Sequence, residues 1–357
     1  MTESLTEQTR GTTTAAPPRD RLVALPVQLI PLDDAVLLRR GGAELKIAGA
    51  GAQAALTALL QAFRAPGATV AEALERFPEP DRAELGTLVT ELRKRRLLVA
   101  ADVPWEDDRA DVFYWHVGQS ARTVRQTLAS RAITVIGVNT VSQRLVPALT
   151  ALGAADVRLL DFPELRNTAL TPQDLLRDGV GTAGPDWLDQ AGPDTVHCVI
   201  AASDFGRVPS LRPWNRFCAQ ARLPFLPVVQ DNLVGTIGPL AVFGETPCYE
   251  CLRAREASQL DDPDAHRAVE PEAWAGQRFT AAHPAASAVL AELAAVEVSK
   301  WFGGGRPPTR QAGTLIEVNV AEPAVRTRRV LRIPRCPVCS PANAHAATAI
   351  RMNGSDL

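Results

Sequence analysis

The chain of 357 residues lacks a long hydrophobic run, an excess of either charge and an export signal, and each absence excludes a class of protein. No stretch approaches the ~18–20 consecutive apolar residues that a membrane span needs. With 38 Lys and Arg against 40 Asp and Glu, the net charge of -2 gives no general attraction to nucleic acid or anionic lipid. Residues 1–20 lack the apolar core of a secretory signal. We therefore expect a cytoplasmic protein with neither a nucleic-acid nor a membrane partner.

Composition and length predict a globular protein with more than one domain. Apolar residues make up 46% of the chain and charged residues 22%, which is enough to form cores. At ~100–200 residues per domain, two or three domains fit. We expect disorder at 1–19 and 341–357, a first domain at 20–102, a linker and helix at 103–130, and a second domain at 131–340.

The first domain has the pattern of a winged-helix-like unit of three strands and three helices. Apolar runs predict strands at 22–30, 35–40 and 43–48, and Gly41-Gly42 suits a tight hairpin between the last two. Helical spacing follows around 54–63, 70–77 and 81–95. A short strand at 97–99 closes the unit.

The second domain has the alternation of an α/β fold with a doubly wound, mostly parallel, Rossmann-like sheet. A continuous apolar run predicts a strand buried on both faces at 132–137, and further strands are predicted at 157–161, 196–201 and 225–229. Helices are predicted at 120–130, 142–153, 214–221 and 284–302. Residues 260–276 are acidic and contain proline, so we expect a mobile loop there.

Four of the six cysteines form two CxxC pairs, Cys248 with Cys251 and Cys336 with Cys339. Two such knuckles complete a tetrahedral Cys₄ shell, which predicts one structural zinc ion with no open position for substrate. The alternative is a redox role for the pairs. Cys198 and Cys218 lie in apolar surroundings and are interpreted as buried free thiols.

The turn that begins at Gly137 occupies the place of a dinucleotide-type phosphate loop, because it follows a strand and opens a helix. Only the first glycine of the motif is present, and Asn139 brings a side chain to where the backbone must approach phosphate. Asp161 and Asp204 end two later strands, where ligands bind such sheets. We interpret these four residues as a degenerate nucleotide site; the alternative is that the acids only cap strand ends.

These residues carry a family resemblance. Gly137, Asp161 and Asp204, followed by the segments 235–239 and 246–253 and the final CPVC, resemble in their order the ThiF-like proteins of the ubiquitin-activating superfamily. The resemblance covers roughly residues 110–340. Residues 20–102 are similar to the PqqD-like peptide-recognition domain by pattern.

Together the two halves resemble the ThiF-like partners of YcaO cyclodehydratases, which serve the biosynthesis of thiazole- and oxazole-modified peptides such as thiopeptides and bacteriocins. The resemblance implies a non-catalytic scaffold with no catalytic residues, which binds the leader of a ribosomally made precursor and presents it to a separate YcaO-type enzyme. ATP is then not expected on this chain, zinc is structural, and a homodimer is allowed.

Strand addition at an exposed edge is a physical route to leader binding. The predicted edge carries Glu44, Leu45, Lys46 and Ile47. Three residues of the helix at 81–95 are predicted to line a groove beside it and to suit an acidic leader: Arg82, Val89 and Arg93. The alternative for the arginines is a solvated helix face.

Two other functions stay open at this point. One is an ATP-dependent adenylyltransferase acting on a peptide or carrier-protein carboxylate, since active ThiF-like proteins adenylate a carboxyl terminus with a glycine-rich loop, a basic residue and an aspartate. Arg166 is the basic candidate near Asp161. The other is a DNA-binding regulator that uses the first domain. The basic run 93–96 favours this function, whereas the overall charge of the chain does not.

Overall fold

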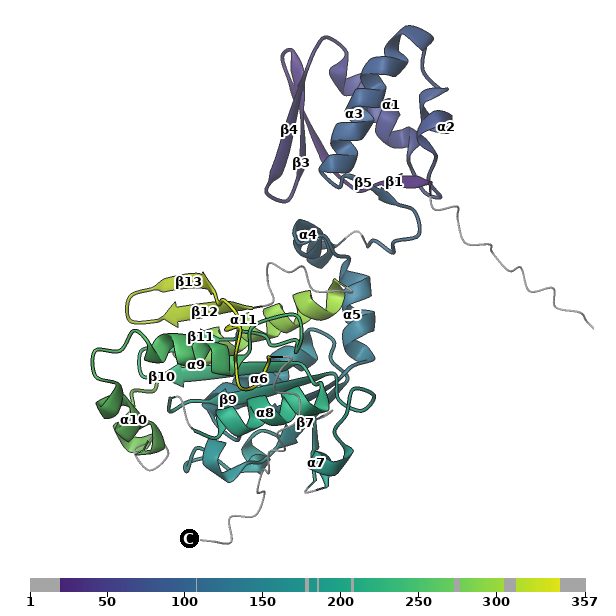
Figure 1. The fold of residues 1–357 in the computed structure, drawn as a ribbon. Coiled ribbons are helices and arrows are strands. Elements are labelled where there is room, and N and C mark those ends of the chain that lie inside the picture. The colour runs from purple at the N-terminus through teal and green to yellow at the C-terminus, as the bar shows by residue number, and fades with distance from the viewer. Residues whose placement is uncertain are drawn as a thin grey trace, which may run out of the picture. The chain divides into compact units, whose positions relative to one another are not determined.

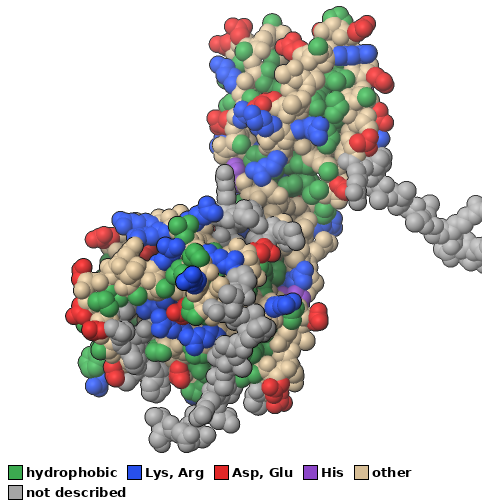
Figure 2. Space-filling model, viewed as in Figure 1, with side chains coloured by type: hydrophobic (Ala, Val, Ile, Leu, Met, Phe, Trp, Pro, Cys, Tyr) green, Lys and Arg blue, Asp and Glu red, His purple; other side chains and the backbone are tan. Residues whose placement is uncertain are grey.

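The computed structural model describes residues 20–106, 108–176, 180–184, 186–206, 209–272, 277–304 and 313–340 (Figure 1). The chain divides into two compact units, residues 1–122 and 123–357, which are considered separately. The expected disorder at 1–19 and 341–357 falls outside the described residues. Lys and Arg side chains occur among Asp and Glu on the visible face of each unit, as the small net charge suggests (Figure 2).

Unit 1 contains two small antiparallel sheets, four α-helices and one 3₁₀ helix among its described residues. Strands β2, β3 and β4 pair in that order, and β1 pairs with β5. The elements are β1 (Leu22–Ala24), β2 (Gln28–Leu32), β3 (Ala35–Arg40), β4 (Ala43–Ala48), α1 (Ala52–Ala62), α2 (Val70–Leu74), η1 (Glu79–Asp81), α3 (Arg82–Lys94), β5 (Leu98–Ala100) and α4 (Arg109–His116).

The strand predicted at 22–30 is two strands in different sheets. Pro26 lies between them, and proline lacks the N–H that a continuous ladder requires. Its carbonyl instead accepts a hydrogen bond from Arg40 Nη1 at 2.7 Å. The remaining strands and the three helices of the pattern are present, while the likeness to a winged helix stays a prediction.

Unit 2 is built on an eight-stranded sheet with the order β13-β12-β11-β10-β9-β6-β7-β8. Neighbouring strands from β10 to β8 are parallel, and β11, β12 and β13 are added antiparallel. Its strands are β6 (Ala132–Ile136), β7 (Asp156–Leu160), β8 (Val180–Thr182), β9 (Cys198–Ser203), β10 (Phe225–Asp231), β11 (Val234–Ile237), β12 (Thr314–Asn319) and β13 (Ala324–Arg329). The predicted mostly parallel α/β sheet is confirmed.

Helices cover both faces of this sheet. The connection β6-α6-β7 and the connection β9-α8-β10 run in opposite directions from the centre, so right-handed crossovers place α6 and α8 on opposite faces. Helix α11 packs on α6, and α9 packs near α8. The helices are α5 (Ala121–Ala129), α6 (Thr140–Ala151), η2 (Pro163–Leu165), η3 (Pro172–Asp174), α7 (Trp187–Gln190), α8 (Leu211–Ala221), α9 (Tyr249–Ala257), α10 (Pro263–Glu272), η4 (Gln277–Phe279) and α11 (Pro284–Gly303).

The prediction of a mobile loop at 260–276 is wrong, because helix α10 occupies most of this segment. Asp262 Oδ1 accepts hydrogen bonds from the N–H groups of Asp264 and Ala265, and Pro263 lies at the first helical position. This is the chemistry of a helix start, so the acidic residues and proline that suggested a loop instead begin a helix. In the described part of the chain, no helix combines the length and apolar character needed to cross a membrane.

The aromatic core under α8 generates a stability prediction. Trp214 is fully buried and contacts the rings of Phe162, Trp187 and Phe217 at centroid distances of 5.4 to 5.9 Å. Trp214→Ala is expected to lower the free energy of unfolding by about 3–5 kcal/mol, because it removes this burial and leaves a cavity. Urea unfolding measures the change. Phe279→Ala, at a 78% exposed ring, should stay within about 0.5 kcal/mol, and equal losses in both variants would contradict the prediction.

Candidate active site and metal centre

The strand order of unit 2 creates a switch point between β6 and β9. These strands are parallel neighbours, and the chain leaves their carboxyl ends towards opposite faces of the sheet. Open α/β sheets bind ligands in the crevice at such a point. The residues that follow the two strands here are those of the turn at Gly137 and Asp204, so the structure brings these predicted site residues to one edge.

Asn139 fills the turn after β6. Its side chain is fully buried, and its Nδ2 donates to the carbonyls of Ala202 at 2.7 Å and Leu165 at 3.1 Å. Its Oδ1 accepts the Ser142 N–H, which caps α6. Gly137 has a φ of 103°, and a Cβ there would lie 2.6 Å from the Ala202 carbonyl oxygen. The turn therefore keeps the one glycine that its backbone requires, while the Asn139 side chain occupies space that a glycine-rich loop leaves open.

Asp204 is the most buried acid of the site, with an exposed fraction of 2%. Its Oδ2 accepts three hydrogen bonds, from the N–H and Oγ1 of Thr140 at 2.8 and 2.7 Å and from Asn167 Nδ2 at 2.8 Å. Its Oδ1 is also buried and has no hydrogen-bond partner among the described residues. A buried, unpaired carboxylate oxygen is costly, so it marks a position where a ligand or ion would be stabilising.

A chain of polar contacts links Asp204 to α11. Thr140 Oγ1 lies 2.9 Å from Ser287 Oγ, and Ser287 Oγ lies 2.8 Å from Gln230 Oε1. Within the described residues, Gln230 Nε2 is a second buried polar atom without a partner. Thr140, Ser287 and Gln230 were not predicted as site residues. The only signal was that Thr140 and Gln230 stand near the carboxyl ends of predicted strands.

Asp161, at the end of β7, forms a two-pronged ion pair with Arg166. Arg166 Nε lies 2.9 Å from Asp161 Oδ1, and its Nη2 contacts Oδ2. Gln277 holds the same segment, because its Nε2 donates to the Arg166 carbonyl at 3.0 Å and its Oε1 accepts the Thr168 N–H at 3.1 Å. The acid and the basic candidate thus lie together on the segment that also supplies Asn167 to Asp204.

The four predicted zinc ligands lie in one buried cluster. The Sγ atoms of Cys248, Cys251, Cys336 and Cys339 are all within 4.8 Å of one another, so the cluster could hold a metal ion. The Ile333 N–H lies 3.5 Å from Cys251 Sγ, a contact that stabilises a thiolate. Four sulfur ligands at this spacing suit tetrahedral zinc.

Electrostatics in the cluster favour thiolates at two positions. Hydrogen bonding lowers the pKa of Cys251 far below its usual range; the bond to Cys248 is the largest cause, followed by those to Cys336 and Cys339. Hydrogen bonding to Cys248 is also the main cause that lowers the pKa of Cys336, to about 6. The thiolate is the form that ligates a metal.

The other two cysteines are buried apart from this cluster. Burial alone raises the pKa of the Cys198 thiol to about 12, and burial followed by the nearby Cys198 raises that of Cys218 well above its usual value. Such thiols are inert, as predicted for free buried cysteines.

The predicted peptide-binding residues lie on two elements of unit 1. Among the described residues, strand β4 pairs only with β3. Glu44 and Lys46 are exposed on it, while Leu45 and Ile47 are partly buried. On α3, Arg82 Nε donates to the Phe77 carbonyl at 2.9 Å, and Arg93 is exposed.

Val89 requires a correction. Its exposed fraction is 1%, and it packs in the core of unit 1, so it does not line an accessible groove. The apolar spacing that predicted this helix includes Val89 because its side chain points into the core.

Solved structures with the same fold include E. coli MccB. MccB with MccA-N7isoASN is 19% identical, with a TM-score of 0.62, and the match covers 89% of this chain and 99% of that chain. MccB with ATP is 19% identical with a TM-score of 0.60 and the same coverage. The heterocyclase TruD is 18% identical with a TM-score of 0.59 over 90% of this chain and 43% of that chain. No protein-family model and no curated protein matches the chain.

These neighbours confirm the ThiF-like fold and correct two expectations. One is described as the heterocyclase TruD, another as the Microcin C7 biosynthetic enzyme MccB in complex with N-formylated MccA, and a third as MccB with ATP. The hypothesis of a non-catalytic scaffold and the expectation that ATP plays no part are therefore both contradicted. The findings favour the alternative, an ATP-dependent adenylyltransferase.

The cysteine cluster predicts a measurable loss of metal. Cys336→Ser is expected to abolish stoichiometric zinc in the purified protein and to lower its melting temperature, because one ligand of a closed shell is lost. Elemental analysis and thermal unfolding are the two measurements. Cys198→Ala, a matched removal of a buried thiol outside the cluster, should leave the zinc content unchanged; zinc retained in Cys336→Ser would show that the cluster is not the metal site.

Proposed function

We propose that this chain is an ATP-dependent adenylyltransferase that activates the carboxylate of a ribosomally made peptide. The observation that carries the proposal is Asp204, a buried carboxylate at the switch point of the sheet with one oxygen left unpaired among the described residues. Ligands bind sheets of this class at that edge. The likeness to MccB with ATP supports the same assignment.

The free Oδ1 of Asp204 fits a divalent cation that accompanies a nucleotide. Mg²⁺ prefers oxygen ligands and is commonly held by one or two carboxylates together with substrate phosphates. When bound, such an ion would neutralise charge on the phosphates. Thr140 and Asn167 direct their donors to Oδ2, which fixes the carboxylate and keeps Oδ1 open.

The phosphate contacts differ from those of a glycine-rich loop. Asn139 occupies the turn, and the first amides of α6 donate to Asn139 and Asp204. The amino end of α6 is thus already capped, so phosphate binding relies first on the cation at Asp204; Arg166 contributes when it exchanges its ion pair with Asp161 for a phosphate. Arg166 lies beside Asp161, whose carboxylate is placed to accept a ribose hydroxyl at the end of β7.

The reaction follows from these groups. A carboxylate oxygen of the peptide attacks the α-phosphorus of ATP, and the bond from that phosphorus to the oxygen bridging to the β-phosphate breaks. The products are an acyl adenylate and pyrophosphate, so atoms and charge balance without a further reactant. Asp204 positions the cation, and Arg166 offers positive charge to the phosphates.

The peptide itself is proposed to bind along β4 of unit 1. In the part of the chain that the structure describes, this strand has no second partner, so its edge suits main-chain pairing with an added strand. Arg93 on α3 is exposed and adds positive charge for an acidic peptide. A thiazole- or oxazole-forming pathway with a YcaO-type partner, and a homodimeric state, are the finer expectations from the family resemblance.

Asp204 gives the direct test of catalysis. Peptide-dependent exchange of labelled pyrophosphate into ATP is expected for the wild type and is expected to fall at least about 100-fold in Asp204→Asn, because the variant loses the charge that holds the cation. Asp189→Asn removes an exposed acid of α7 and should exchange normally. Absence of exchange in the wild type with candidate precursor peptides and Mg-ATP would overturn the proposed function.

Arg93 gives a separate test of peptide recognition. Fluorescence polarisation of a labelled acidic precursor peptide with the full chain is expected to show weaker binding by Arg93→Glu, by about fivefold or more at low salt, because attraction becomes repulsion. Arg64→Glu makes the same charge change at another exposed position of unit 1. Equal binding by both variants would argue against the α3 side of the proposed groove.

A further inference from the structure

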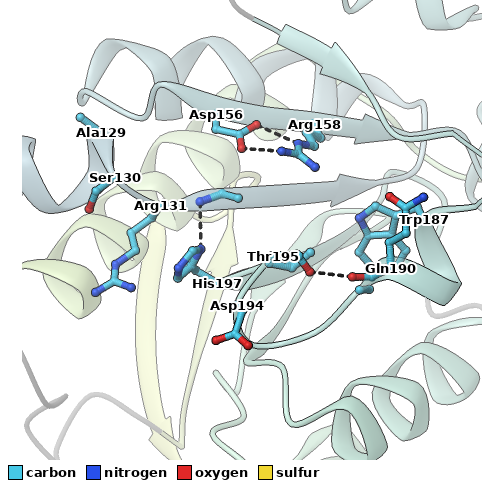
Figure 3. Close-up of a pocket in the computed structure, with 13 residues that line it drawn as sticks. Ala129, Ser130, Arg131, Asp156, Arg158, Trp187, Gln190, Asp194, Thr195 and His197 are labelled. Carbon is cyan, nitrogen blue, oxygen red and sulfur yellow. Dashed lines mark hydrogen bonds and ion pairs between the residues drawn. The ribbon is translucent and has the colours of Figure 1, made fainter.

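Two cavities meet at the amino-terminal edge of the sheet in unit 2, at the opposite ends of the strands from Asp204. One, of about 450 Å³, lies at the beginnings of β6 and β7 and the segment before β9 (Figure 3). The other, of about 530 Å³, lies between α5 and the end of α11. Arg131 and His197 line both cavities, so these two side chains mark the place where the cavities join.

His197 presents a hydrogen-bond donor at this junction. Its Nδ1 accepts the Ala132 N–H at 3.1 Å (Figure 3). The proton of the neutral ring is therefore on Nε2, which can donate to a ligand. Burial of the imidazole is the main cause that lowers the pKa of His197, and the charge of Arg131 lowers it further, against opposing effects of Asp156 and Asp194.

Arg131 and Trp187 add donors that lack acceptors. Arg131 Nε is buried with no hydrogen-bond partner, and no ion pair of Arg131 occurs among the described residues. The Trp187 side chain, at the far end of the first cavity, is 5% exposed and its Nε1 also lacks a partner in the described part of the chain. By contrast, Arg158 is satisfied by a two-pronged pair with Asp156 at 2.8 and 2.9 Å.

The remaining acids do not neutralise Arg131. Asp194 lines the first cavity and Glu245 the second, and neither forms an ion pair with Arg131 in the described residues. An unpaired guanidinium beside an imidazole N–H is the donor set that binds oxyanions. We propose that Arg131 and His197 form a binding site for a small oxyanion, a phosphate-like or carboxylate group, where the two cavities meet.

Bound anion and bound proton should stabilise each other at this site. A negative charge beside His197 favours the imidazolium and so raises its pKa from the lowered value of the free protein. By linkage, the anion should bind more tightly as the pH falls through the pKa of His197. The groups that face His197 are Arg131, Asp156 and Asp194, and Glu245 lies across the second cavity.

NMR titration of the histidine side chains tests the site in the full chain. The sequence has only five histidines, and His197→Gln identifies the signal. Sulfate is the probe for a tetrahedral anion, since it does not titrate near neutral pH, and acetate is the probe for a carboxylate; sodium chloride keeps the ionic strength constant. We expect a saturable rise in the His197 pKa with one of the two probes in the millimolar range.

Two variants, one that removes a positive charge and one that removes a negative charge, distinguish a specific anion site from general screening by salt. Arg131→Gln is expected to weaken anion binding at least about tenfold, and Asp194→Asn to strengthen it. Arg144→Gln, at an exposed arginine of α6, is the matched control and should bind like the wild type.

A rise in pKa that does not saturate, that chloride reproduces, or that persists in Arg131→Gln would overturn the proposal. Should Arg131→Gln fail to fold, unchanged affinity in Asp194→Asn would overturn it equally. None of these measurements depends on ATP or on adenylation, so the result is independent of the proposed function.

Discussion

The buried charge of Asp204 is the constraint on which the carboxyl edge of the sheet depends. A carboxylate taken out of water costs several kcal/mol unless donors surround it, and three donors converge on its Oδ2. They come from the start of α6 and from the segment after β7, and Thr140 extends the contact to Ser287 on α11. One buried side chain thereby fixes three elements at the switch point. Its second oxygen has no hydrogen-bond partner in the described residues, and this is the atom to which the proposed cation would bind.

Asn139 explains how this site departs from a glycine-rich phosphate loop. The amino end of a helix carries positive partial charge that commonly stabilises phosphate. In α6 the first N–H groups, which carry this partial charge, already donate hydrogen bonds to the side chains of Asn139 and Asp204. A nucleotide at this edge is therefore expected to depend on a cation and on Arg166 more than on backbone amides.

The cysteine cluster has a separate, architectural consequence. It joins two segments 88 residues apart, the start of α9 and the segment after β13, and its cysteines belong to the same core as Trp214. Arg255 and Arg332 reinforce the junction through backbone carbonyls of the opposite segment, at 2.7 Å to Leu331 and 2.9 Å to Gly244. The residues of β13 are mostly exposed, so this strand adds little hydrophobic packing to the junction. A metal ion bound by the four cysteines would hold the two segments together without that packing.

The sequence by itself determined the local features of this protein, and the tertiary structure decided which of them act together. Apolar runs located β6, β9 and β10 closely, because a strand buried on both faces is largely apolar along its whole length. The CxxC spacing located the metal cluster, because two thiolates of a knuckle need it. The partners Thr140, Asn167, Gln230 and Ser287 had no such pattern. They became a site only because the strand order places β9 beside β6, and hydrogen bonds between polar groups far apart in sequence leave no periodic signal. Val89 shows the same limit, since an inward-pointing residue and a groove residue have the same spacing until the packing is known.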